Sequence, residues 1–226
     1  MPLPLQRPRR RRVLQAVGAA LLLGLLLGGP TSRAREPRAP APPATIIAYH
    51  DSGEWDRDTT AAIARASRLL AAGLSRPAGR PAIVLDVDDT SLSSYDCLKR
   101  ANFVRSAARA CIAAATLPAI PQTLRLYREA RRRHVTVFFV TGRRESSRGA
   151  TTTNLEREGY TAGWRLIMRP DGPRRATNAT YKASRRRRIT RRGFRVLVNV
   201  GDQRSDLVGG HARANVKVPN PMYVTR

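Results

Sequence analysis

The sequence predicts an α/β fold, a three-layer arrangement in which helices cover both faces of a mainly parallel central sheet. Short apolar runs alternate along the chain with segments of helical periodicity, which is the pattern of strands joined by crossover helices. The runs are apolar at nearly every position, as is typical of strands buried on both faces of a parallel sheet. Polar residues follow the longer runs, so we expect the functional side chains at the carboxyl edge of the sheet.

The predicted elements follow in order from residue 58. Ile63, Ala66 and Leu70 recur at helical spacing, which predicts a first helix over residues 58–74. Strands are predicted at residues 82–85, 135–140, 165–168 and 196–200, with a short fifth candidate at 216–218. The intervening helices are predicted at residues 122–132, 146–158 and 180–192.

Residues 1–34 have the features of an export signal. A basic stretch at residues 7–12 precedes an apolar run at 13–29, and Ser32-Arg33-Ala34 offers a small-residue cleavage site. The basic stretch also resembles a twin-arginine signal, and an uncleaved apolar run would be long enough to act as a membrane anchor. We therefore expect an exported protein, secreted or extracytoplasmic, that touches a membrane only through an uncleaved N-terminal segment.

The rest of the chain is predicted to form one tether and one domain. Residues 35–47 are rich in Pro, Ala and Arg, which predicts a flexible tether, and residues 48–226 are predicted to form the folded domain. A chain of 226 residues with 42% hydrophobic residues can bury a sizeable core. The sequence predicts no particular oligomeric state.

Two cysteines, Cys97 and Cys111, would meet an oxidising compartment after export. A continuous helix between them would hold their Cα atoms about 21 Å apart, far beyond the reach of a disulfide. A disulfide therefore requires the helix to break near residues 102–106. Two free thiols are the alternative.

The charge of the chain is strongly basic, with 42 Lys and Arg against 16 Asp and Glu. Binding to nucleic acid or to an anionic surface stays an alternative, but an aromatic content of 5% does not favour it. The arginine run at residues 185–188 is predicted to be a solvated helix face, and an anion-steering surface near the site is the alternative. The acidic residues are more informative, because five of the sixteen fall in two short segments: Asp86, Asp88, Asp89, Asp202 and Asp206.

Both acidic segments follow predicted strands, so their carboxylates should meet at one edge of the sheet. Carboxylates this close repel one another unless a cation neutralises them, and oxygen ligands suit Mg²⁺. We expect Mg²⁺ to be held by Asp86, Asp88 and Asp202, with Asp206 in support. Mg²⁺ held by few carboxylates indicates phosphoryl chemistry, since the ion also binds substrate phosphate.

The same residues supply the parts that phosphoryl transfer needs. Asp86 is the candidate nucleophile, and Asp88 can protonate the leaving oxygen and later activate water. Thr141 and Gly142 follow the second predicted strand and can bind phosphate oxygens. Lys182, one of three lysines in a chain that otherwise uses arginine, can add a compact positive charge.

Four motifs resemble those of the haloacid dehalogenase (HAD) superfamily, namely residues 83–90, residues 140–143, Lys182 and residues 201–206. More narrowly, residues 91–93, 117–121, 181–184 and 218–223 resemble the exported acid phosphatases of subfamily IIIB, which include plant vegetative storage proteins and bacterial class B enzymes.

This resemblance implies a Rossmann-like core with only a small helical cap. It also implies Mg²⁺-dependent hydrolysis of small phosphomonoesters through an aspartyl-phosphate, with Asp88 binding the metal through its main-chain carbonyl. Residues 96–115 match no family pattern; we expect them to overhang the pocket and to influence the choice of substrate. Two alternatives use the same fold: a non-catalytic, storage-like or polyanion-binding protein, and a phosphotransferase that passes phosphate to an alcohol.

Overall fold

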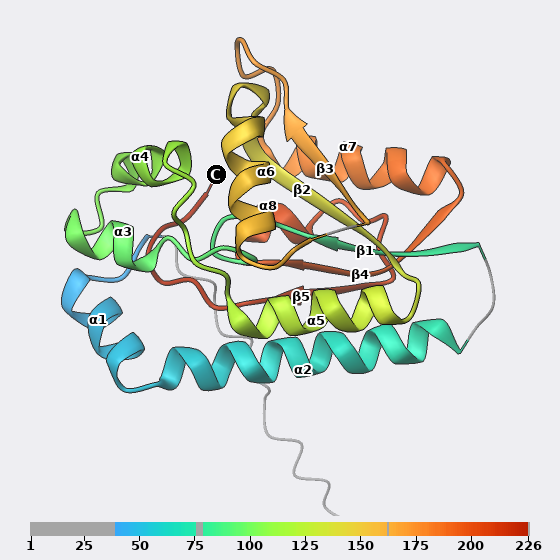
Figure 1. The fold of residues 1–226 in the computed structure, drawn as a ribbon, viewed down its shortest axis with the longest axis horizontal. Coiled ribbons are helices and arrows are strands. Elements are labelled where there is room, and N and C mark those ends of the chain that lie inside the picture. Colours follow the sequence, from blue (N-terminus) through green and yellow to red (C-terminus); the bar gives the residue numbers. More distant parts are fainter. Residues whose placement is uncertain (1–38, 76–78, 162, 226) are drawn as a thin grey trace, which may run out of the picture. The chain divides into compact units, whose positions relative to one another are not determined.

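The computed structural model describes residues 39–75, 79–161 and 163–225 (Figure 1). The predicted export signal and residues 35–38 of the predicted tether lie outside this part. Within the described ranges, no helix combines the length and the apolar character that crossing a membrane would require.

A sheet of five parallel strands forms the centre of the domain, in the order β3-β2-β1-β4-β5. This confirms the predicted α/β class, and each predicted strand is present. The sequence runs are apolar at successive positions because the inner strands are covered on both faces. The strands are β1 (Arg80–Leu85), β2 (Thr136–Arg144), β3 (Trp164–Arg169), β4 (Phe194–Gly201) and β5 (Ala214–Lys217).

Helices cover both faces of this sheet, and alternate residues of β1 point to different cores. Ile83 and Leu85 pack with α2 (Glu54–Leu74) and α5 (Pro121–Arg132), whereas Ala82 and Val84 lie in a second cluster with Ile189 of α7 (Asn178–Arg191). Figure 1 shows α2 and α5 together on one side of the strands and α7 on the other. The remaining helices are α1 (Pro43–Asp51), α3 (Tyr95–Arg100), α4 (Ala108–Ala113), α6 (Arg148–Arg157), α8 (Arg204–Leu207) and the 3₁₀ turns η1 (Arg105–Ala107) and η2 (Glu145–Ser147).

The register of the inner strands brings their ends to one edge. Leu85, the last residue of β1, pairs with Phe139 of β2 and with Val200 of β4. The backbone N–H of Asp86 donates to the carbonyl of Val200 at 3.0 Å, which fixes the first residue beyond the strand. The segments that follow β1 and β4 therefore begin side by side, whereas β2 continues past this point to Arg144.

The C-terminal part of the predicted tether belongs to the fold, which corrects the expectation for residues 43–47. Helix α1 begins at Pro43, and its Ile46 is fully buried against Leu98 and Met222. The backbone N–H of Ala41 donates to the carbonyl of Pro221 at 2.9 Å. The Pro- and Ala-rich composition looked like that of a linker, but burial of a single isoleucine and pairing with the C-terminal segment order it.

Cys97 and Cys111 form a disulfide with their Cα atoms 6.5 Å apart. The helix breaks where a disulfide requires it to break: α3 ends at Arg100, and Asn102 and Phe103 have φ of 46° and 60°. The chain then turns through η1 into α4, which brings Cys111 back to Cys97. The alternative of two free thiols is wrong.

Candidate active site

A cavity of about 780 Å³ opens at the carboxyl edge of the sheet. Its walls come from the segments that follow β1 and β4, as predicted, and from residues 105–112, so the segment 96–115 overhangs the site. Residues 142–144 also line it, but they belong to β2, which runs to Arg144 and does not end at residue 140 as predicted. All five clustered aspartates line the cavity: Asp86, Asp88, Asp89, Asp202 and Asp206.

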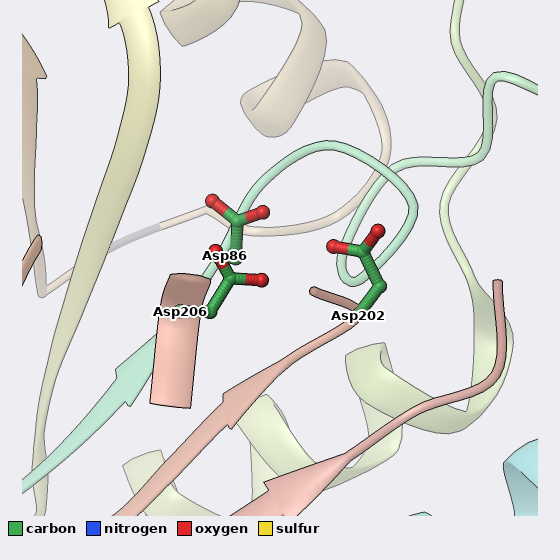
Figure 2. Close-up of side chains that lie close together, drawn as sticks. All are labelled: Asp86, Asp202 and Asp206. Carbon is green, nitrogen blue, oxygen red and sulfur yellow. The ribbon is translucent and has the colours of Figure 1, made fainter. Parts of the chain in front are cut away.

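Three carboxylates gather at the floor of the cavity. Figure 2 shows Asp86 beyond β1 and Asp206 on α8 close together, with Asp202 facing them from the end of β4. Each offers one oxygen such that the three oxygens lie within 4.8 Å of one another, and all three residues are buried. The Nζ atom of Lys182 on α7 lies 2.6 Å from Oδ1 of Asp86 and 2.6 Å from Oδ1 of Asp206.

Burial governs the protonation of this cluster. It raises the pKa of Asp86 to about 7, because desolvation and the neighbouring Asp206 outweigh the attraction of Lys182. Burial and the charges of Asp206 and Asp86 also raise the pKa of Asp202 well above its ordinary value. Burial opposes the charged form of Lys182, but Asp206 and Asp86 outweigh it and raise the pKa of the ammonium group.

This cluster fits a divalent metal ion. Three buried carboxylates face one ammonium group, which leaves excess negative charge in a place where water cannot disperse it. Carboxylate oxygens are the ligands of hard cations such as Mg²⁺. The three-carboxylate cluster contains the side chain of Asp206 and not that of Asp88.

The close approach of Asp206 depends on a glycine. A Cβ atom on Gly201 would lie 2.3 Å from Cβ of Asp206, so only glycine leaves room for this side chain. Asp206 also accepts a hydrogen bond from the backbone N–H of Gln203 at 2.8 Å, which closes a capping box at the start of α8. The spacing Gly-Asp-x-x-x-Asp thus places Asp202 and Asp206 on the same cavity wall.

Asp88 points to a different partner. Its carboxylate accepts hydrogen bonds from Nε and Nη2 of Arg143, with the shortest at 2.8 Å, and its side chain is 29% exposed to the cavity. Arg143 is buried, and its Nη1 donates to Thr151 of α6 at 3.0 Å. Arg143 therefore fixes where the Asp88 carboxylate sits. The motif Thr-Gly-Arg contains this residue, but nothing in the motif alone assigns it a role.

The carboxylate of Asp89, the residue directly after Asp88, is structural. Asp89 has φ of 53° and is buried, and its carboxylate accepts hydrogen bonds from the N–H and hydroxyl of Ser94 and from the hydroxyl of Tyr223. Burial raises the pKa of Asp89 to about 6. These contacts tie the loop after β1 to the start of α3 and to the C-terminal segment.

Asp202 is held by amide and hydroxyl donors. Thr90 donates to Oδ1 at 3.2 Å, and Gln203 and Asn220 donate to Oδ2, each at 2.7 Å. Asn220 and Tyr223 lie in the segment 218–223, which resembles the subfamily IIIB acid phosphatases. The resemblance alone assigns no role to either residue. Their contacts with Asp202 and Asp89 explain how this segment serves the site.

The predicted phosphate-binding residues differ in position. Gly142 and Lys182 line the cavity. Thr141 is fully buried and is not among the lining residues; its Oγ1 accepts a hydrogen bond from the backbone N–H of Arg143 at 3.1 Å.

Arg186 on α7 belongs to the arginine run at residues 185–188, which is predicted to be a solvated helix face. For Arg186 this prediction is wrong. The residue is only 1% exposed, and its guanidinium donates to the carbonyls of Asp206, Val208 and Gly210. Arg186 lies one helical turn after Lys182 on α7. Lys182 binds the carboxylate of Asp206, and Arg186 binds the backbone carbonyls of the segment that contains it.

A parallel sheet with buried aspartates and a lysine at its carboxyl edge defines a site suited to phosphate chemistry, with carboxylates that fit a divalent metal ion. The family model for the HAD superfamily, subfamily IIIB (acid phosphatase), matches residues 37–226. The chain belongs to this family.

Three curated relatives are similar to parts of the chain. Acid phosphatase 1 of Solanum lycopersicum is 34% identical over 64% of this chain, the stem 28 kDa glycoprotein of Glycine max is 34% identical over 47%, and vegetative storage protein 1 of Arabidopsis thaliana is 28% identical over 62%. The matched segments span 59%, 43% and 54% of these relatives' own lengths.

A solved structure shares the fold. The class C acid phosphatase from Bacillus anthracis superposes with a TM-score of 0.67 at 20% sequence identity, over 80% of this chain and 84% of the other. This similarity confirms the HAD-like, Rossmann-type architecture.

Proposed function

We propose that the protein is an exported, Mg²⁺-dependent acid phosphatase that hydrolyses small phosphomonoesters through an aspartyl-phosphate on Asp86. The observation that carries this proposal is the assembly at one cavity floor of Asp86, Lys182, Asp202 and Asp206, with Asp88 held beside them by Arg143. Family membership supports the reaction class.

In the first step, a carboxylate oxygen of Asp86 attacks phosphorus and the ester P–O bond breaks. The proton of the Asp88 carboxylic acid passes to the leaving oxygen, so the alcohol departs uncharged. Lys182 and Gly142 line the cavity and are the proposed phosphate-binding groups, with Lys182 countering the charge on the phosphoryl oxygens. Thr141 would support them from behind the lining, through the hydrogen bond that its Oγ1 accepts from the backbone N–H of Arg143. Asp86 is left as an acyl phosphate, and Asp88 is left as a carboxylate.

In the second step, the Asp88 carboxylate takes a proton from water while the water oxygen attacks phosphorus. The bond between Asp86 and phosphorus breaks, which releases inorganic phosphate and restores both side chains. An alcohol in place of water would give phosphotransfer at the same site.

Asp86, Asp202 and Asp206, with the carbonyl of Asp88, would hold the metal ion. When bound, Mg²⁺ supplies positive charge to the phosphoryl oxygens and favours the ionised form of Asp86. A storage-like role without catalysis is not favoured, because the nucleophile, the acid and the lysine are all present and assembled.

Export is supported by the disulfide between Cys97 and Cys111. Such bonds persist in oxidising compartments and are rare in the cytosol.

The test is release of inorganic phosphate from an aryl phosphate by the purified protein, with Mg²⁺ and after chelation. We expect turnover that is lost on chelation and lost in Asp86→Asn. Asp58→Asn is the matched control, since it makes the same change at an exposed carboxylate of α2. Absence of wild-type turnover across pH and divalent metals would refute the proposal.

A further inference from the structure

The charges that line the active-site cavity are separated by depth. All five aspartates have partners and four of them are buried, whereas four arginines that are exposed or half-buried line the mouth and come from three parts of the chain. Arg105 and Arg109 come from η1 and α4, in the segment at the left of Figure 1. Arg144 ends β2, and Arg174 follows β3.

These four arginines have no carboxylate partner. Among the residues that the structure describes, no ion pair includes any of them. Arg105 donates to the hydroxyl of Thr225 at 3.2 Å, and Arg144 donates to the carbonyls of Pro170 and Gly172.

Arg109 and Arg174 are less constrained still. Both are exposed, and within the described ranges no hydrogen bond, ion pair or ring contact is found for either. Guanidinium groups that line one cavity without a carboxylate partner are suited to bind an oxyanion, since each presents paired N–H donors.

The mouth of the cavity is poorly suited to bind a flat ring. Tyr223 is the single aromatic residue among the described lining residues. Its hydroxyl is bound to Asp89, and the guanidinium of Arg105 lies 4.7 Å from its ring centroid. Stacking of a nucleobase or aryl group on a free aromatic side chain is therefore not what this lining offers.

From this separation of charge we propose that the cavity prefers phosphomonoesters with a second anionic group, a phosphate or carboxylate, joined through a non-aromatic linker. The scissile phosphate would lie at the aspartate floor, and the second anion would bind between Arg109 and Arg174. A volume of about 780 Å³ is large enough for both groups. This inference rests on the proposed function, because the floor is taken to bind the transferred phosphate.

The test compares binding of alkane-α,ω-diphosphonates with binding of alkylphosphonates of the same chain length, by calorimetry in MgCl₂. For at least one length we expect the diphosphonate to bind at least about tenfold more tightly, the gain of a charge-assisted contact. The double variant Arg109→Ala/Arg174→Ala should reduce this preference to less than about threefold. Arg65→Ala/Arg68→Ala, on exposed positions of α2, removes the same charge outside the cavity and should preserve it.

Equal binding of both probe types at every length would overturn the inference. An equal loss in the two double variants would also overturn it, since net charge alone would then explain the preference. Turnover of an aryl phosphate is measured in parallel. Because the binding comparison needs no catalysis, a retained preference without turnover would refute the phosphatase function and support the anion site.

Discussion

Removal of the disulfide is expected to destabilise the domain by an amount that the loop length sets. Cys97 and Cys111 are separated by 14 positions, so the bond closes a loop of about 15 residues. For such a loop, the chain-entropy model gives a loss of about 3 kcal/mol at 25 °C when the bond is absent. We therefore expect Cys97→Ala/Cys111→Ala to lower the free energy of unfolding by about 3 kcal/mol.

The assay is equilibrium unfolding in urea, followed by circular dichroism. Each single alanine variant removes the same bond, so Cys97→Ala and Cys111→Ala should each be destabilised about as much as the double variant. Reduction of the wild-type protein should give a similar loss. A change below about 1 kcal/mol, or single variants whose effects add, would refute the reasoning.

Three further predictions concern other parts of the molecule. His50 stacks between Trp55 and Tyr95, and burial lowers its pKa to about 4. The unfolded chain binds this proton at an ordinary pKa near 6.5, so stability is present above pH 6.5 and falls toward pH 4. Allowing for partial exposure, we expect the free energy of unfolding, measured in urea, to fall by about 1.5 kcal/mol between pH 6.5 and pH 4. His50→Phe should abolish this fall, and a variant with the same pH dependence as the wild-type protein would contradict the reasoning. Arg186→Met leaves three backbone carbonyls without their donor and should cost on the order of 3 kcal/mol in the same assay; a loss below about 1 kcal/mol would argue against this role. Gly201→Ala should displace Asp206 and weaken Mg²⁺ binding by about tenfold or more in a titration, whereas unchanged affinity would show that Asp206 does not support the metal.

Much of the fold could be predicted because the strands are buried on both faces. A strand such as β1 must be apolar at successive positions, and residues 82–85 are all apolar. The carboxyl edge followed from the parallel order, and this edge brought Asp86 and Asp202 to one cavity.

The remainder depends on tertiary contacts that leave a weak trace in sequence. Helix α1 is stabilised because Ile46 packs against Leu98 and Met222. This tertiary contact outweighs the local preference of a Pro- and Ala-rich segment for a linker. The helix break after α3 places Asn102 and Phe103 at positive φ. Glycine is the residue that usually marks such a position in a sequence, and neither residue is a glycine.

The arginines show the same limit most clearly. Arg186 is buried while its neighbours Arg187 and Arg188 are exposed, although all three are the same residue type in one run. Arg143 and Arg109 also cannot be told apart by composition, yet one holds Asp88 and the other stands at the cavity mouth. The role of each arginine depends on the direction in which its side chain points in the folded protein, which the sequence does not show.

The most direct test of the central claim is to trap the phosphoryl group on Asp86. In Asp88→Asn, para-nitrophenyl phosphate should still react, because its leaving group departs without a proton, while hydrolysis of the acyl phosphate slows. Mass spectrometry of the acid-quenched variant should then find one added phosphoryl group on the peptide that contains Asp86. A phosphoryl group on another residue, or none while the wild-type protein turns over, would contradict the account.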